Sequence, residues 1–217
     1  EILRIIEKER ATIFIGVPTM YSALIAAQEN HQHDLSSLKF CISGGAPLNP
    51  EIGMFFTALG LRILQGYGQT ETSPSVSINI PSTMKLHTVG PPLKGVEVKI
   101  ADDGEILVRG ELVMQGYWRN DEATRETIRD GWVHTGDIGL IDEDGHLRIT
   151  DRKKDIIVNS GGDNISPQRI EGILTIEAEI AQAMVYGDKR SHLVSLLVPD
   201  ADWLAGWAEA AGKPARL

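Results

Sequence analysis

The chain has 217 residues, of which 42% are hydrophobic, and a formal net charge of −9. This length and hydrophobic content suffice for a packed core, whereas the acidic balance and dispersed Lys and Arg argue against nonspecific nucleic-acid binding. A single cysteine, Cys41, excludes an internal disulfide framework and a cysteine-based zinc site. We therefore expect a globular protein of the cytoplasm, either soluble or in peripheral contact with a membrane surface.

The start of the given sequence does not resemble a signal peptide. The opening EILRIIEKER lacks the regions of a signal peptide, and no apolar run approaches the roughly 20 residues needed to cross a bilayer. The first residue is not Met, and the closing GKPARL shows no helix stop. These features indicate a piece of a longer protein.

The first third of the chain alternates strand-like and helix-like segments. They are, in order, TIFIGV, PTMYSALIAAQ, LKFCISGG, NPEIGMFFTALG and RILQ, between residues 12 and 65. This order predicts successive βαβ units on a parallel sheet. Pro18, and Asn49 followed by Pro50, are typical of helix starts. Because each helix would begin where a strand ends, we expect ligands at that edge of the sheet.

Two changes of pattern follow. After Pro81 the short strands VEVKI, EILVRG and HLRIT, with Asp-Gly turns at residues 103–104 and 144–145, predict an antiparallel or barrel-like subdomain. From Arg152 onward, KKDIIV, a helix at about 166–176, the strands AQAMVYG and VSLLVP, and a helix from about Asp200 predict an α+β unit.

The expected fold class is therefore α/β in three parts. Residues 1–80 form a portion of a parallel βαβ core, residues 81–151 a small β-barrel-like subdomain, and residues 152–217 a hinge with part of a small α+β C-terminal domain.

Two glycine-containing motifs follow consecutive predicted strands. In residues 43–48, SGGAPL, paired glycines let a ligand approach the backbone, although a lone glycine pair by itself favours a plain strand-to-helix turn. In residues 65–71, QGYGQTE, Tyr67 can lie flat on a base, Thr70 can donate to a phosphate and Glu71 can hold Mg²⁺. The alternative for Tyr67 is a structural role in a tight turn.

These motifs resemble those of adenylate-forming acyl-CoA synthetases, most closely long- or medium-chain fatty acyl-CoA ligases. The resemblance continues through GEILVRG, the GYW of residues 116–118, the WVHTGD of residues 132–137, GHLRITDRKKDIIVNSGG and QRIE, in the order in which the family carries them.

The resemblance implies a role for each matching position. Gly45 and Ala46 would line the adenine and Tyr67 would stack on it; Thr70 would contact the α-phosphate and Glu71 would bind Mg²⁺, which makes both catalytic. Asp137 and Arg152 would hold the ribose, Lys154 would be a hinge, and Gly161 and Gly162 would line the pantetheine tunnel.

The implied reaction joins an acid to coenzyme A. The acid and ATP would give acyl-AMP and pyrophosphate, and the thiol of coenzyme A would then displace AMP; ATP and coenzyme A are co-substrates and Mg²⁺ is the metal. The phosphate loop with its lysine, and a second lysine motif, do not occur in the sequence. We expect them before Glu1 and beyond Leu217, and we expect the chain by itself to be inactive or nearly so.

Other readings stay open. An amino-acid or aryl-acid adenylation domain, a luciferase-like monooxygenase or a noncatalytic nucleotide-binding module would share the fold. His134 has no partner at metal-ligand spacing, so a structural role is expected, and residues 142–145 are expected to form a hairpin turn and not a calcium loop. Asp163 and residues 167–169 depart from the family pattern at a helix start, where they would alter capping.

Overall fold

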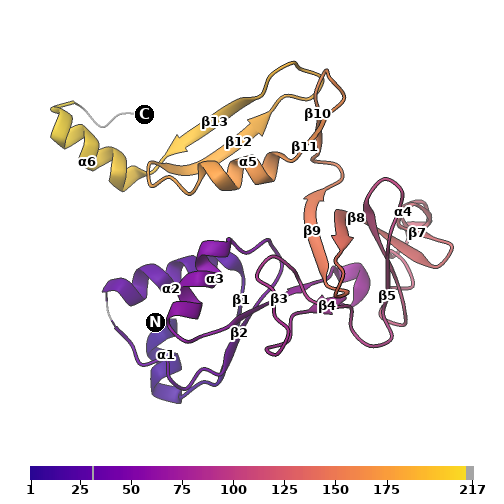
Figure 1. Ribbon diagram of the computed structural model, residues 1–217, viewed down its shortest axis with the longest axis horizontal. Helices are drawn as coiled ribbons and strands as arrows, with labels where there is room; N and C mark the ends of the chain where they lie inside the picture. The colour runs from indigo at the N-terminus through magenta and orange to yellow at the C-terminus, as the bar shows by residue number, and fades with distance from the viewer. Residues whose placement is uncertain (31, 214–217) are drawn as a thin grey trace. The chain divides into compact units, whose positions relative to one another are not determined.

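The computed structural model describes residues 1–30 and 32–213 (Figure 1). The chain divides into two compact units, Glu1–Thr150 and Asp151–Leu217. The second unit thus starts one residue before Arg152, where the sequence pattern changes. None of the helices in the described residues is long and apolar enough to cross a membrane.

The first unit opens with a parallel sheet and its helices. The strands β1 (Ile13–Gly16), β2 (Phe40–Ser43) and β3 (Ile63–Tyr67) pair in parallel in that order, and the short β4 (Ser77–Ile78) joins β3 in the antiparallel sense. The helices are α1 (Ile2–Glu9), α2 (Pro18–Asn30) and α3 (Pro50–Ala58). The predicted βαβ order is confirmed, whereas α1 was not expected from the sequence.

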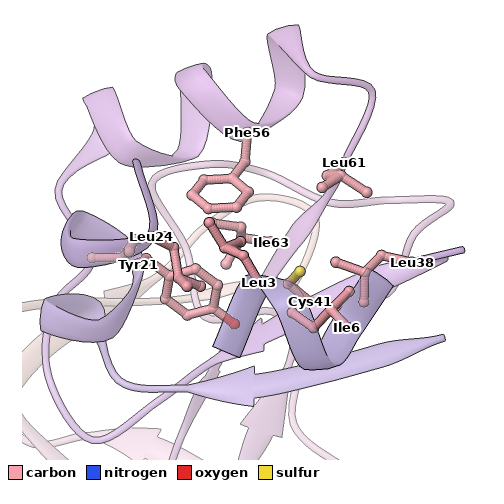
Figure 2. Close-up of a cluster of buried hydrophobic side chains, with 10 residues drawn as sticks. Leu3, Ile6, Tyr21, Leu24, Leu38, Cys41, Phe56, Leu61 and Ile63 are labelled. Carbon is pink, nitrogen blue, oxygen red and sulfur yellow. The ribbon is translucent and has the colours of Figure 1, made fainter. Parts of the chain in front are cut away.

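One face of this sheet carries the first hydrophobic core (Figure 2). The helices contribute Leu3, Ile6, Tyr21, Leu24 and Phe56, and the strands contribute Cys41 and Ile63. Tyr21 is fully buried and donates its hydroxyl to the carbonyl of Ile42 at 2.7 Å. Burial raises the pKa of Cys41 to about 11, which marks the lone thiol as a core group.

The core also explains where the helices begin. The Asn49 side chain accepts a hydrogen bond from the backbone N–H of Glu51 at 2.9 Å, which satisfies one of the free donors at the start of α3. In α1, Leu3 and Ile6 are three residues apart and both are buried, so one stripe of a short charged helix packs on the sheet. The helices α2 and α3 start after the carboxyl ends of β1 and β2, at the edge of the sheet where the candidate ligand motifs begin.

The rest of the first unit is antiparallel. The strands are β5 (Glu97–Ile100), β6 (Glu105–Arg109), β7 (Ile128–Arg129), β8 (Trp132–Ile141) and β9 (Leu147–Arg152), in the order β5-β6-β8-β7 with β9 also paired to β8; α4 spans Asp121–Thr127. Over the described residues this sheet is open and does not close into the barrel-like form that was expected. Its core contains Val76, Ile106, Val108, Val133 and Leu147, and Tyr67 packs against it.

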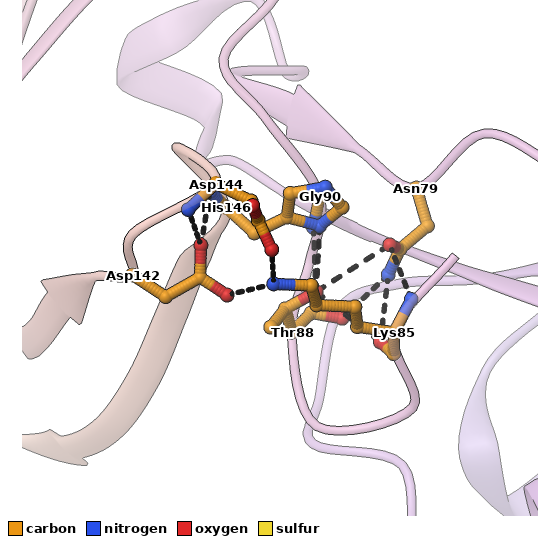
Figure 3. Close-up of polar contacts among 7 residues, drawn as sticks. All are labelled: Asn79, Lys85, Thr88, Gly90, Asp142, Asp144 and His146. Atoms are coloured by element: carbon orange, nitrogen blue, oxygen red, sulfur yellow. Dashed lines mark hydrogen bonds and ion pairs between the residues drawn. The ribbon is translucent and has the colours of Figure 1, made fainter. Parts of the chain in front are cut away.

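A polar network ties the loop after β4 to the turn between β8 and β9 (Figure 3). Its members are Asn79, Lys85, Thr88, Gly90, Asp142, Asp144 and His146. The Lys85 ammonium lies 2.7 Å from Asp142 Oδ2, and the N–H of Gly145 bonds the carbonyl of Asp142 at 2.9 Å. Gly145 has φ 80°, so the expected hairpin turn is confirmed.

The second unit is a small α+β body. It contains the hairpin β10 (Ile157–Val158) and β11 (Asn164–Ile165), then α5 (Pro167–Leu174), the antiparallel pair β12 (Ile180–Tyr186) and β13 (Val194–Pro199), and α6 (Ala201–Ala211). Ser166 caps α5 by accepting a hydrogen bond from the N–H of Arg169. Gly212 ends α6 in a left-handed conformation, so the expectation that the closing segment lacks a helix stop is wrong; residues 214–217 lie outside the described residues.

Candidate nucleotide-binding site

Two of the predicted motifs meet at the carboxyl edge of the parallel sheet. Ser43 at the end of β2 is in register with Gln65 of β3, so the SGGAPL and GYGQTE segments leave the sheet as neighbours. A Cβ added at Gly44 would lie 3.8 Å from the carbonyl oxygen of Gly66. Gly45 has φ 81°, a conformation that favours glycine, and its neighbour Ala46 is exposed.

The loop after β3 is tightly closed. The N–H of Val76 bonds the carbonyl of Tyr67 at 2.8 Å, and a Cβ at Gly68 would lie 1.5 Å from the carbonyl oxygen of Pro74. Between them a single 3₁₀ turn, η1 (Thr70–Thr72), presents Thr70 and Glu71. Because β3 extends to Tyr67, the start of this motif belongs to the strand and not to the loop.

Asp137 stands at the centre of the polar contacts in this region. It lies on β8 with only 6% of its surface exposed, and its Oδ2 accepts hydrogen bonds from the hydroxyl of Tyr67 at 2.6 Å and from Nε2 of Gln69 at 2.7 Å. The same Gln69 amide donates to the carbonyl of Thr135 at 2.9 Å. A buried carboxylate requires such donors. The predicted stacking residue and the predicted ribose ligand are therefore in direct contact.

Glu71 is held from a different part of the chain. The hydroxyl of Tyr117 donates to Glu71 Oε1 at 2.7 Å, and the N–H of Met114 donates to the Glu71 carbonyl at 2.9 Å. The hydrogen bond to Glu71 raises the pKa of Tyr117, because ionising the phenol would place a second negative charge beside the carboxylate. Tyr117 lies in the GYW motif and Gln69 in the GYGQTE motif, but the motifs alone assigned neither of them a partner.

His134 has a structural contact. Its Nδ1 lies 3.1 Å from Oε2 of Glu105, and Oε1 of the same carboxylate accepts a hydrogen bond from the N–H of Gly136 at 2.9 Å. Glu105 is buried, so these contacts compensate the cost of placing a carboxylate between β6 and β8. The expected structural role of His134 agrees with this pairing.

A metal at Glu71 would need further ligands from a bound nucleotide. Over residues 1–30 and 32–213 there is no group of three or more His, Cys, Asp or Glu side chains placed to hold an ion. Mg²⁺ is commonly held in proteins by only one or two carboxylates, with substrate phosphates and water completing its shell. The half-buried carboxylate of Glu71 suits that arrangement.

The other four predicted residues, Arg152, Lys154, Gly161 and Gly162, belong to the second unit. Arg152 is the last residue of β9, and Lys154 lies in the turn that follows, where the N–H of Asp155 bonds the carbonyl of Arg152 at 2.9 Å. Gly161 and Gly162 form the turn of the β10–β11 hairpin, and Gly162 has φ 87°. That turn requires a glycine for its own geometry.

The chain matches a known protein family. The sequence pattern of the family described as AMP-binding enzyme matches residues 1–118, more than half of the chain. The chain belongs to the AMP-binding enzyme family.

Several members of the AMP-binding enzyme family are similar over most of this chain. The long-chain-fatty-acid–CoA ligase FadD15 of Mycobacterium bovis is 47% identical over 80% of the chain and 29% of its own length. The feruloyl-CoA synthase of an Amycolatopsis species is 37% identical over 93% of the chain and 41% of its own length. The chain thus spans less than half of the curated relatives that it matches.

Solved structures show the same fold. The o-succinylbenzoate CoA synthetase of Bacillus subtilis, in complex with its acyl-adenylate intermediate, superposes with a TM-score of 0.82 and 30% identity, covering 96% of this chain and 46% of that one. The same enzyme has been solved with ATP and a magnesium ion, with a TM-score of 0.80. An amide bond synthetase of Marinactinospora thermotolerans gives a TM-score of 0.79 at 32% identity, covering 96% of this chain and 47% of that one.

Proposed function

We propose that this chain is the nucleotide-binding part of an ATP-dependent fatty acid–CoA ligase. The observation that carries the proposal is the contact of Tyr67 with Asp137, 2.6 Å between hydroxyl and carboxylate, beside the glycine turn at Gly44 and Gly45. An aromatic ring, an acceptor for vicinal hydroxyls and a backbone without side chains are together suited to an adenosine. The 47% identity to a long-chain-fatty-acid–CoA ligase supports the fatty acid as substrate.

In the proposed first reaction, a carboxylate oxygen of the acid attacks the α-phosphorus of ATP and pyrophosphate leaves. In the second, the sulfur of coenzyme A attacks the acyl carbon and AMP leaves, which gives the thioester. Tyr67 would lie on the adenine, Asp137 and Arg152 would hold the ribose hydroxyls, and Thr70 would donate to the α-phosphate. Glu71 would hold Mg²⁺, which supplies neutralising charge to the phosphates when it is bound.

The second unit would serve the second reaction. Lys154 lies in the turn that opens this unit, and a hinge needs only a few residues at such an element boundary to absorb a change of backbone angles. We assign Lys154 this role, and we place Gly161 and Gly162 beside the pantetheine arm of coenzyme A. Lys154→Pro in the full-length protein would then slow thioester formation more than adenylation.

Binding and turnover separate the proposal from its rivals. Calorimetric titration of the 217-residue chain with AMP should show binding that Asp137→Ala removes, and a chain that binds no AMP would refute the nucleotide site. Thioester formation by the full-length protein should be faster with octanoic or hexadecanoic acid than with ferulic acid. Binding of AMP by a full-length protein that shows no acid-dependent turnover would indicate a noncatalytic module.

An aryl acid is the second candidate substrate. It is favoured by the feruloyl-CoA synthase, which is similar over 93% of the chain, and by the o-succinylbenzoate CoA synthetase, whose fold matches over 96% of it. A ratio of rates that favours ferulic or benzoic acid over hexadecanoic acid would support this candidate and overturn the fatty-acid assignment.

A further inference from the structure

The loop of residues 114–120 is built with unusual constraint for a surface connection. Gly116 has φ 147°, and a Cβ there would lie 2.8 Å from the Thr124 side chain. The N–H of Tyr117 bonds the Thr124 hydroxyl at 2.9 Å, and Arg119 adopts the left-handed conformation with φ 52° just before Asn120 caps α4. A non-glycine residue at such an angle is uncommon and indicates that its surroundings fix it.

Two residues of this constrained loop donate hydrogen bonds to Glu71. Met114 N–H bonds the Glu71 backbone carbonyl at 2.9 Å and the Tyr117 hydroxyl bonds Oε1 at 2.7 Å. An ionised carboxylate is only an acceptor, so the phenol must be the donor. No described residue donates a hydrogen bond to the second carboxylate oxygen, Oε2, which keeps its coordinating capacity.

We propose that Tyr117 is a positioning residue that fixes the Glu71 carboxylate so that Oε2 faces the metal of a bound nucleotide. The proposal rests on the proposed function, because the nucleotide and its metal are part of it. The Tyr117 hydroxyl at Oε1 restrains rotation of the carboxylate, and the bond from Met114 holds the Glu71 backbone in place. A phenylalanine at this position would keep the ring packing and lose only the restraint.

The first test needs no nucleotide. A double-mutant cycle in chemical denaturation of the 217-residue chain, with Tyr117→Phe, Glu71→Gln and both changes together, measures the coupling between the phenol and the carboxylate. Because the Tyr117 hydroxyl donates to Glu71 Oε1 at 2.7 Å, the effects of the two changes on the free energy of unfolding should not be additive. Additive effects would overturn the contact and the proposal with it.

The second test separates positioning from folding. In the presence of ATP, the affinity for Mn²⁺, followed by electron paramagnetic resonance, should fall roughly three- to tenfold in Tyr117→Phe, as expected for one lost hydrogen bond. Metal-free AMP affinity should not change, and the exposed control Tyr186→Phe should change neither value. In the Glu71→Gln background, Tyr117→Phe should have no further effect on Mn²⁺.

The outcomes separate the positioning role of Tyr117 from the proposed function. A wild-type chain that binds AMP, together with unchanged Mn²⁺ affinity in Tyr117→Phe, refutes the positioning role and leaves the proposed function intact. A wild-type chain that binds neither AMP nor ATP with Mn²⁺ refutes the proposed function, and the role assigned to Tyr117 falls with it. Loss of metal-free AMP binding in Tyr117→Phe also overturns the proposal, because the hydroxyl would then act on the whole fold.

Discussion

Removal of the Tyr67 hydroxyl tests the centre of the site. In Tyr67→Phe the ring stays, but Asp137, which is only 6% exposed, loses a hydrogen-bond donor at 2.6 Å. Hydrogen bonds to charged groups contribute about 1.5–3 kcal/mol. Gln69 still donates to the same oxygen, so we expect a loss of about 1–2 kcal/mol, at or just below the low end of that range.

Loss of this hydrogen bond should lower both the stability of the fold and the affinity for AMP. For a unit of 150 residues, about 2–4 °C of unfolding temperature corresponds to 1 kcal/mol, so the midpoint should fall by roughly 2–8 °C. AMP affinity should fall only about fivefold, since the ring can still stack on the base while the carboxylate is less well oriented. Tyr67→Leu removes the ring as well, and should weaken AMP further by about 1–3 kcal/mol.

Thermal unfolding by circular dichroism and calorimetric titration with AMP give the two quantities. Tyr186→Phe is the matched control, because it removes a hydroxyl from a tyrosine that is 55% exposed in the second unit. Two results would refute the reasoning. One is a Tyr67→Phe chain that unfolds and binds AMP like wild type, and the other is equal AMP affinity in Tyr67→Phe and Tyr67→Leu.

Three further changes have defined outcomes. Gly68→Ala places a Cβ 1.5 Å from a backbone oxygen and should abolish AMP binding and lower the unfolding midpoint, whereas Gly44→Ala, with 3.8 Å of clearance, should leave the midpoint unchanged. The Lys85 ammonium lowers the pKa of Asp142 to about 2, from an ordinary 3.8. The stabilising contribution of the Asp142 carboxylate is therefore complete above about pH 4 and is lost as the pH falls toward 2. The acid-unfolding curve of Asp142→Asn should lack this component. Gly172→Ala, in the middle of α5 with open space around it, should stabilise the second unit by about 0.5–1 kcal/mol in chemical denaturation, and a destabilised variant would show that its backbone is not helical.

Local patterns explain which elements could be predicted. The apolar run VSLLVP became β13 over Val194–Pro199, and the Asn-Pro pair at residue 49 starts α3, because strands and capped helices are determined by short-range signals. The helix α4 was missed because DEATRET contains no apolar stripe. Its formation depends on Asn120, whose side chain accepts from the N–H of Ala123.

Contacts within the site could not be predicted in the same way. Tyr67 and Asp137 are separated by 70 positions, and their contact depends on the placement of β8 beside the end of β3, which no local pattern specifies. The family resemblance assigned both residues to one nucleotide, yet it left the partners of Gln69 and Tyr117 open. Pairing across such separations follows from tertiary packing rather than from sequence spacing.

The motif glycines are required for different physical reasons. Each motif glycine can be interpreted as space for a ligand, but at Gly68 that space is occupied by the carbonyl of Pro74. At Gly162 the backbone angle alone demands glycine. Gly44 differs, because its nearest non-neighbouring atom would be 3.8 Å from an added Cβ and its φ is not in the left-handed region. An alanine at Gly44 that keeps the fold but weakens AMP would therefore assign this glycine to the ligand, whereas unchanged AMP affinity would assign it to the turn.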